Sequence, residues 1–260
     1  MTHAPRPPSQ PGDVYFFATC VVDQFFPGAG MDAITLLERL GIRVHFPDEQ
    51  TCCGQPAYTS GFPEEARKVA AHQLTLFPNP WPVIVPSGSC AGMMKHHYPH
   101  LFASDPARLA QVEALSKRIY EFTDFLVNVL DYQPQDNGDD CTVVLHTSCA
   151  ARREMGVHLT GRKLLGALSQ VSIAQQDHES ECCGFGGTFS IKQPEISGAM
   201  VEDKVKSLKA TGAERVVSAD CGCLMNILGH AAWKDQQEGR SAPSLPGEHI
   251  ASFLLRRTDK

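Results

Sequence analysis

Short apolar runs alternate with amphipathic stretches through the first half of the chain. Runs rich in apolar, β-branched and aromatic residues predict buried strands at residues 14–19, 42–46 and 81–86. Apolar residues at helical spacing predict helices through residues 34–40, 62–76 and 120–130. This half therefore consists of strands connected by helices.

The same order of elements returns after residue 140. Strands are predicted at residues 142–146, 171–174 and 214–218. Helices are predicted through residues 164–168, 194–211 and 249–256. Strands alternating with helices form parallel sheets covered on both faces. We therefore expect an α/β fold of two pseudo-repeated βαβ-type units with largely parallel sheets.

A polar, turn-rich segment at residues 132–140 separates the two halves and is the expected linker. We expect a first domain at residues 13–131 and a second at residues 141–256. The expected tails are a flexible Pro-rich segment at residues 1–12 and a short one at residues 257–260.

Composition excludes several classes of protein. Of the 260 residues, 42% are hydrophobic and 20% charged, which is normal for a globular chain. The net charge of −6 provides no overall basic balance that would attract nucleic acid. No apolar run reaches the ~20 residues of a membrane span, and the N-terminal segment has no apolar secretory core. We expect a cytoplasmic protein.

Ten cysteines are the anomaly in this composition: Cys20, Cys52, Cys53, Cys90, Cys141, Cys149, Cys182, Cys183, Cys221 and Cys223. A reducing cytosol disfavours structural disulfides, and a chain of this length does not need them. Metal binding, catalysis or redox chemistry is the usual reason for so many thiols. The alternative is that several are ordinary small core residues.

The cysteines form a repeat. Cys20 lies 32 positions before Cys52, and Cys149 lies 33 positions before Cys182; both distances end in a Cys-Cys-Gly sequence. A further cysteine follows in each half, at Cys90 and Cys223. Such internal repetition indicates one structural unit used twice.

The position of these cysteines points to metal sites. In parallel sheets, sites form beyond the carboxyl ends of the strands, and the repeated cysteines all follow predicted strands. Thiolates select zinc, copper(I) or iron–sulfur clusters. Neither half has the Cys-x-x-Cys pattern of structural zinc sites, and adjacent cysteines suit a bulky cluster. Glycines 184, 186 and 187 let backbone amides approach sulfur, whereas the segment lacks the lysine of a phosphate-binding loop.

The ordered strings around these cysteines resemble the cysteine-rich CCG domain, present twice. The most specific are Cys52-Cys53-Gly54-Gln55-Pro56, Ser87-Gly88-Ser89-Cys90 and Cys182-Cys183-Gly184-Phe185-Gly186-Gly187. This domain occurs in the cysteine-rich subunit of heterodisulfide reductase and in the iron–sulfur subunit of glycolate oxidase. The chain is similar over nearly its whole length to the lactate utilization protein A family, whose short chains carry two such domains.

The resemblance implies two iron–sulfur clusters, expected as [4Fe–4S]. Their ligands would be Cys20, Cys52, Cys53 and Cys90 in the first half, and Cys149, Cys182, Cys183 and Cys223 in the second. The reductase repeat ends in Cys-x-x-Cys, but Met93 and Asn226 stand at the last position here. This departure counts against noncubane clusters, which stay an alternative, and favours ordinary cubanes. Zinc at one site is also open, above all at the first. Cys221 is an additional candidate metal ligand.

The resemblance also implies a function. The chain is expected to be an iron–sulfur electron-transfer subunit of a multi-protein system that oxidises L-lactate to pyruvate. Its expected partners are companion lactate-utilization proteins, one of them a ferredoxin-like iron–sulfur protein. It would be a subunit of an L-lactate dehydrogenase-type complex rather than a complete enzyme, and no catalytic residue is assigned. Alternatives are the cluster subunit of another hydroxyacid- or disulfide-linked oxidoreductase, or a zinc-stabilised adaptor.

The remaining singled-out residues have ordinary interpretations. Cys141 is expected to be a core thiol, Met93 a packing residue, and His96, His97 and His100 part of a solvated helix face. Two histidines precede cysteines of the second set, His146 and His178. For each, a structural role and a hydrogen bond toward a cluster are both open.

Overall fold

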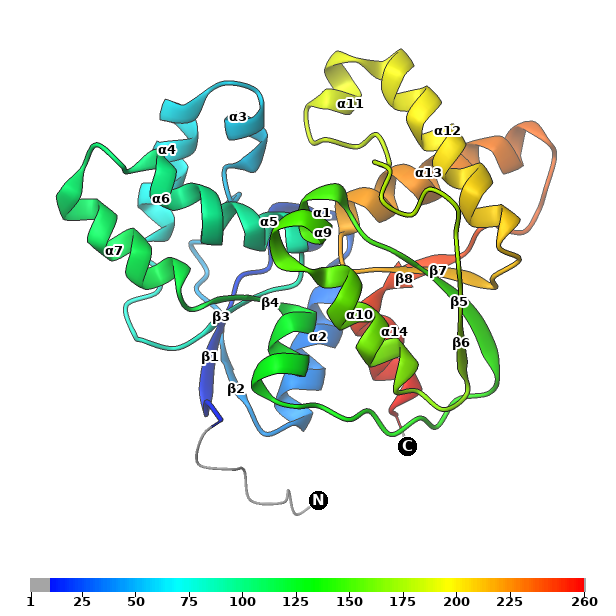
Figure 1. The fold of residues 1–260 in the computed structure, drawn as a ribbon, viewed down its shortest axis with the longest axis horizontal. Helices are drawn as coiled ribbons and strands as arrows, with labels where there is room; N and C mark the ends of the chain where they lie inside the picture. The colour runs from blue at the N-terminus through cyan, green and yellow to red at the C-terminus, as the bar shows by residue number, and fades with distance from the viewer. Residues whose placement is uncertain (1–9, 260) are drawn as a thin grey trace.

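The computed structural model describes residues 10–259 and shows two halves, each with a four-stranded parallel sheet (Figure 1). The first sheet has the order β2-β1-β3-β4, and the second has the matching order β6-β5-β7-β8. Strands of the first half are β1 (Asp13–Phe16), β2 (Arg43–His45), β3 (Val83–Val85) and β4 (Ile119–Glu121). Those of the second half are β5 (Cys141–His146), β6 (Val171–Ala174), β7 (Arg215–Ser218) and β8 (Gly247–His249). The expected α/β fold with two repeated parallel units is confirmed.

Helices of the first half connect its strands and cover its sheet. They are α1 (Cys20–Phe25), α2 (Pro27–Arg39), α3 (Gln55–Thr59), α4 (Pro63–Gln73), α5 (Gly88–Gly92), the π-helix η1 (Met93–His97), α6 (Tyr98–Leu101), α7 (Pro106–Ser116), α8 (Phe122–Asp124) and the π-helix η2 (Phe125–Val129). Pro27 and Pro63 open their helices, where the missing backbone N–H removes no internal hydrogen bond.

The second half repeats this arrangement. Its helices are α9 (Cys149–Met155), α10 (Val157–Gly166), α11 (Phe189–Lys192), α12 (Pro194–Ala210), α13 (Cys221–Gln237) and α14 (Ile250–Arg257). The strand predicted at residues 214–218 is present as β7, but it begins one residue later, at Arg215. The predicted strand at residues 171–174 matches β6.

The fourth strand of each sheet was not predicted from the sequence. The segment 120–130 was expected to be one helix, but β4 occupies Ile119–Glu121 and the helical part begins at Phe122. Similarly, β8 precedes α14. Both strands are three residues long and run into a helix with no Gly or Pro between them. The sequence therefore lacks the turn signal that separates elements.

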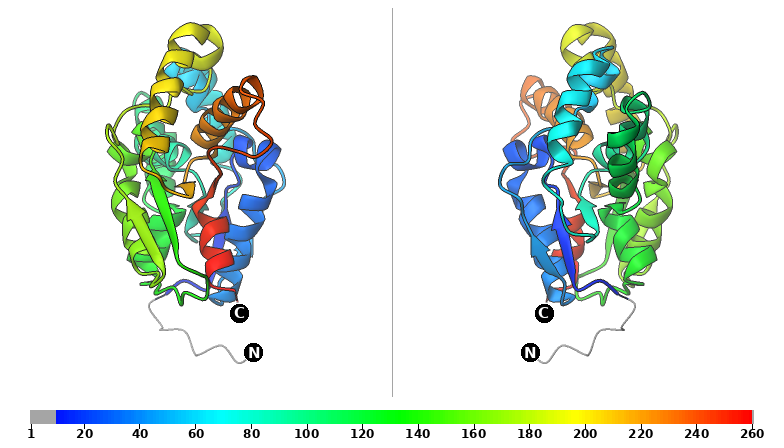
Figure 2. Two further views of the ribbon diagram at one scale, coloured as in Figure 1. Left: turned by 90° about the vertical axis from the view of Figure 1, so that its right-hand side faces the viewer. Right: turned by 90° about the vertical axis from the view of Figure 1, so that its left-hand side faces the viewer.

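The two halves share a core. Helices α2, α8, α10 and α14 lie between the two sheets (Figures 1 and 2), and their apolar residues form one buried cluster with residues of both halves. The linker segment also contacts this region, because Arg257 pairs with Asp136 and the Asn137 N–H donates to the Arg257 carbonyl. The halves are packed against each other rather than joined only by a loop.

The described residues leave out most of the expected N-terminal tail, but they include every helix named above. The expected Pro-rich tail falls mainly on residues 1–9, which lie outside the described residues, as does Lys260. Within residues 10–259, no helix combines the length and the apolar character needed to cross a membrane.

Candidate metal centre

The first cysteine set converges at the carboxyl end of the first sheet. Cys20 begins α1 after a short connection from β1, and Cys90 lies in α5 after β3. The pair Cys52 and Cys53 lies in the loop after β2. The Sγ atoms of Cys53 and Cys90 are 3.3 Å apart. Cys20, Cys52, Cys53 and Cys90 all line one cavity, and Cys20 and Cys52 are close enough to shift each other's pKa. The four thiols therefore form one continuous group.

The second set repeats this geometry. Cys149 begins α9 after β5, Cys223 lies in the first turn of α13 after β7, and Cys182 and Cys183 lie in the loop after β6. The Sγ atoms of Cys183 and Cys223 are 3.1 Å apart. Cys149 and Cys182 line the same cavity, and the pKa of Cys182 responds to both Cys149 and Cys183. The structure thus brings together the two groups of four that the spacing indicated.

A glycine shapes each Cys-Cys loop. Gly54 and Gly184 both have left-handed backbone conformations, with φ of +85° and +82°. Each donates its N–H to the sulfur two residues earlier, Cys52 or Cys182, at 3.4 Å. A Cβ on Gly184 would lie 2.7 Å from the Ser197 carbonyl oxygen. The loops therefore require glycine, and the amide they present to sulfur is the kind of donor found around cysteine-bound clusters.

The thiols of each set perturb one another. Hydrogen bonds from Cys20 and Cys53 lower the pKa of Cys52 to about 3. The bond that Cys20 donates to Cys52, together with burial, raises the pKa of Cys20. In the second set, the bond to Cys182 and burial raise the pKa of Cys149. Crowded thiols of this kind favour sharing negative charge with a cation or cluster over standing as independent thiolates.

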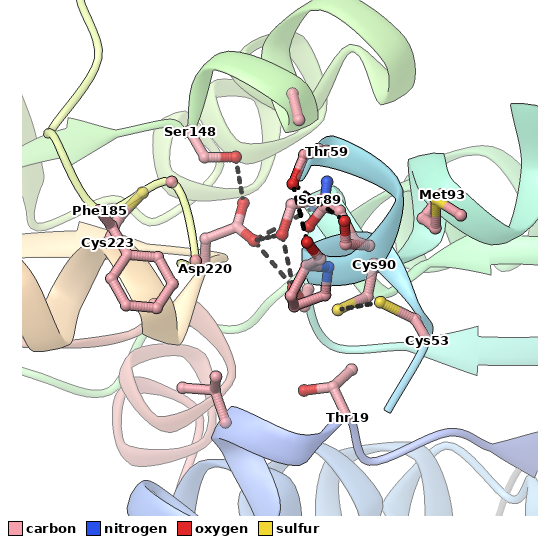
Figure 3. Close-up of a pocket in the computed structure, with 18 of the residues that line it drawn as sticks. Thr19, Cys53, Thr59, Ser89, Cys90, Met93, Ser148, Phe185, Asp220 and Cys223 are labelled. Atoms are coloured by element: carbon pink, nitrogen blue, oxygen red, sulfur yellow. Dashed lines mark hydrogen bonds between the residues drawn. The ribbon is translucent and has the colours of Figure 1, made fainter. Parts of the chain in front are cut away.

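Both sets face one cavity between the halves, of about 430 Å³ (Figure 3). Asp220, just before α13, is the buried polar centre of this region. Its Oδ1 accepts from the Ser87 and Ser89 hydroxyls at 2.8 Å, and its Oδ2 accepts from the Ser148 hydroxyl at 2.6 Å. One carboxylate therefore joins the cysteine-bearing segments of the two halves.

Cys221 lines this cavity but has a different environment from Cys223. It is 1% exposed and packs against Val22 and Ala29 of the first half. Burial is the main cause that raises the pKa of its thiol, with Asp220 and Cys90 adding to it. Gly88 holds the matching position in the first half. The structure thus places Cys221 at the contact between α1 and α13.

His146, the last residue of β5, belongs to the second site. One of its ring nitrogens and the sulfurs of Cys183 and Cys223 all lie within 4.8 Å of one another. The side chain is fully buried, and burial lowers its pKa to about 3, with a smaller contribution from Lys204. The only sequence signal for this role was its place three residues before Cys149.

The other candidate histidines lie elsewhere or pair with other groups. His96 and His100 are exposed, as expected for a solvated face, but His97 lines the cavity and its Nε2 lies 3.1 Å from Glu154 Oε1. His178 is exposed and pairs with Glu181. Of these, only His97 faces the cavity, and the sequence pattern alone did not distinguish it.

Cys141, Met93 and Asn226 are the other positions that the sequence singled out. Cys141 begins β5 at the opposite end of that strand from the site. Met93 is fully buried, as expected for a packing residue, and it also lines the cavity (Figure 3). Asn226 donates its Nδ2–H to the Cys183 carbonyl at 2.8 Å and so fixes the second Cys-Cys loop.

Comparison with known proteins agrees with this arrangement. Residues 14–95 and 143–228 each match the model of the cysteine-rich CCG domain, so the chain is a protein with two CCG domains. It is 44% identical over 244 residues to lactate utilization protein A of Bacillus subtilis (strain 168), covering 94% of this chain and 99% of that one. Identity to lactate utilization protein A 1 of Bacillus mycoides (strain KBAB4) is 43% over 242 residues, 93% and 96% of the two chains. The chain belongs to the lactate utilization protein A family.

One solved structure shares the fold. A hypothetical protein from Helicobacter pylori superposes with a TM-score of 0.68 at 11% identity, over 100% of this chain and 52% of that one. At this identity the likeness concerns the fold alone.

Proposed function

We propose that this chain is an iron–sulfur electron-transfer subunit of a multi-protein system that oxidises L-lactate to pyruvate. Two cofactors are proposed, one [4Fe–4S] cluster in each half. The first would be held by Cys20, Cys52, Cys53 and Cys90, and the second by Cys149, Cys182, Cys183 and Cys223. The observation that carries the proposal is the presence of two groups of four thiols facing one cavity.

The donor sets fit such clusters. All eight ligands would be soft sulfur atoms, and each set contains a pair of thiols in close contact. The loop amides of Gly54 and Gly184 already donate to sulfur. When bound, a cubane cluster accepts or passes one electron at a time. The residues of the chain hold the clusters, limit their contact with water and set their potentials.

The role of a subunit follows from the reaction. Oxidising lactate to pyruvate removes two electrons and two protons, and the one-electron centres proposed here do not supply a proton acceptor. The prominent polar groups of the cavity are engaged with one another, since Asp220 accepts from three serines and His97 pairs with Glu154. The curated relatives are named for lactate utilization. We therefore propose companion lactate-utilization proteins as partners, including a ferredoxin-like iron–sulfur protein.

Lactate turnover tests this proposal. The chain, purified without air and loaded with iron and sulfide, is mixed with L-lactate and an artificial electron acceptor. We expect no turnover by the chain alone and turnover once the companion proteins are added. Cys182→Ser should abolish the activity of the mixture, whereas the control Cys141→Ser should retain it, because Cys141 lies outside both sets. Lactate oxidation by the pure, loaded chain would place the active site on this subunit and contradict the carrier role.

A further inference from the structure

His146 is a buried polar side chain at the end of β5. It is 0% exposed, and within residues 10–259 neither ring nitrogen has a hydrogen-bond partner. Buried polar atoms are nearly always paired, and an unpaired one calls for an explanation such as an ion or a functional role. An unpaired imidazole in a protein interior loses the hydrogen bonds that it makes to water in the unfolded chain.

The ring is close to two cysteines of the second set. A ring nitrogen lies within 4.8 Å of the sulfurs of Cys183 and Cys223, which are themselves in contact. The neutral imidazole has one nitrogen lone pair available, which is the form that binds metals. Imidazole and thiolate are compatible ligands for both iron and zinc.

The first half contrasts with the second at this position. Phe17 stands three residues before Cys20, as His146 stands three residues before Cys149. Phe17 is fully buried in the apolar cluster that contains Cys53. An apolar ring therefore fills the matching place in the first half without any polar requirement. The second half has instead a ring that needs a partner.

The residues at a second pair of equivalent positions, Gln73 and Lys204, also differ, and the second half again has the residue with more polar character. Lys204 of α12 is buried and donates to the His178 carbonyl, whereas the first half has Gln73 of α4 at the equivalent place in its helix. Lys204 interacts electrostatically with Cys182 and Cys183. The second cysteine set is therefore the more polar of the two.

We infer that His146 supplies a nitrogen ligand to the metal centre of the second half, beside the thiolates of Cys183 and Cys223. The inference rests on the proposed function insofar as that centre must be present. The two centres of the chain then differ in chemistry. The first has thiolate ligands only, and the second has mixed thiolate and imidazole ligands. The proposed function assigns four thiolates to that centre, so His146 is a fifth donor, and its neutral imidazole adds no negative charge to the site.

Pulsed electron paramagnetic resonance tests the inference directly. Samples are loaded with iron and sulfide without air, reduced, and prepared with either natural or ¹⁵N-labelled histidine. We expect a strong histidine-nitrogen coupling in the parent chain that changes with the label. It should disappear in His146→Phe, which copies the matching residue of the first half. It should remain in the control His230→Phe, whose ring lies two turns beyond Cys223 in α13.

Metal content measured on the same samples separates this inference from the proposed function. Normal iron and sulfide with no strong histidine coupling, or with a coupling that persists in His146→Phe, overturns the histidine ligand alone. Absence of iron and sulfide contradicts the iron–sulfur proposal. If the second site instead takes zinc, cobalt(II) replaces it as the probe. His146→Phe should then shift the visible absorption bands of the cobalt centre and His230→Phe should not, and bands unchanged in His146→Phe would contradict the ligand assignment.

Discussion

Cys221 and Cys223 show how two thiols only two positions apart acquire different environments. Residues at i and i+2 of a helix do not share a face. Cys223 therefore contacts Cys183, whereas Cys221 packs against Val22 of the first half. Contact with the second set favours Cys223 as the ligand and gives Cys221 a packing role.

Serine substitution separates the two thiols. Cys223→Ser should remove about half of the bound iron, because one of two clusters loses a ligand. Cys221→Ser should remove much less. Iron per chain after anaerobic purification is the measurement. Equal losses in the two variants would show that both thiols bind the second centre.

Glu121 predicts a pH-dependent stability. Its buried carboxyl has a pKa raised by burial from 4.5 to about 8, with the charge of Asp220 adding to the shift. The folded state therefore binds this proton more tightly than the unfolded state does. The stabilisation is complete below about pH 4.5 and is lost as the pH rises to about 8.

Comparison with Glu121→Gln isolates this effect. The free energy of unfolding of the parent chain should fall by roughly 2–5 kcal/mol more than that of the variant between these pH values. Denaturant titrations at a series of pH values measure the difference. Parallel pH profiles for the two chains would show that Glu121 titrates normally.

For individual residues, the sequence predicted which cysteines come together better than it predicted the roles of the histidines near them. The repeated spacing singled out eight thiols because each half contains the same string. His146 left two interpretations open, because its relation to Cys183 exists only after β5 and the loop following β6 come together. His97 was expected on a solvated face because it lies with His96 and His100 in one helical segment after Cys90, and its contact with Glu154 depends on the packing of the two halves.

At the scale of elements, the loop after β6 depends on a glycine that a larger residue cannot replace. Gly184 has a φ of +82°, and an added Cβ would meet the Ser197 carbonyl oxygen at 2.7 Å. Gly198, nearby in α12, has open space around its Cα. Alanine at Gly198 is therefore a suitable control for alanine at Gly184.

Gly184→Ala should destabilise the chain by about 1–3 kcal/mol and reduce iron in the second centre, since the loop must move. Gly198→Ala should be neutral or stabilise by up to about 1 kcal/mol, because alanine favours a helix interior. Urea unfolding and iron analysis check both. A Gly184→Ala chain with parental stability would show that the loop adapts more freely than its contacts indicate.

Element prediction succeeded where hydrophobic periodicity was long and bounded by turn residues. Proline at the start and glycine after the end delimited α12, at Pro194 and Gly212. The strands β4 and β8 were missed because three residues are too few to establish a period of two. They became strands because the neighbours β3 and β7 offered free edges.

At the scale of the whole molecule, the two CCG domains form one site region rather than two separate ones. A shared core lies between the sheets, and Asp220 of the second half accepts hydrogen bonds from Ser87 and Ser89 of the first. This packing would keep the two proposed clusters close to each other. The sequence indicated two repeated units, but their contact depends on pairs such as Gly88 and Ala151 that no periodicity reveals.

Iron and acid-labile sulfide per chain, measured after anaerobic purification and reconstitution, test most directly whether the chain holds two clusters. Two cubanes predict about eight of each per chain. Cys53→Ser and Cys183→Ser should each lower both values to about half, and Cys141→Ser should leave them unchanged, because only the first two change a cluster ligand. Stoichiometric zinc without sulfide, or full iron and sulfide in both ligand variants, would contradict the account.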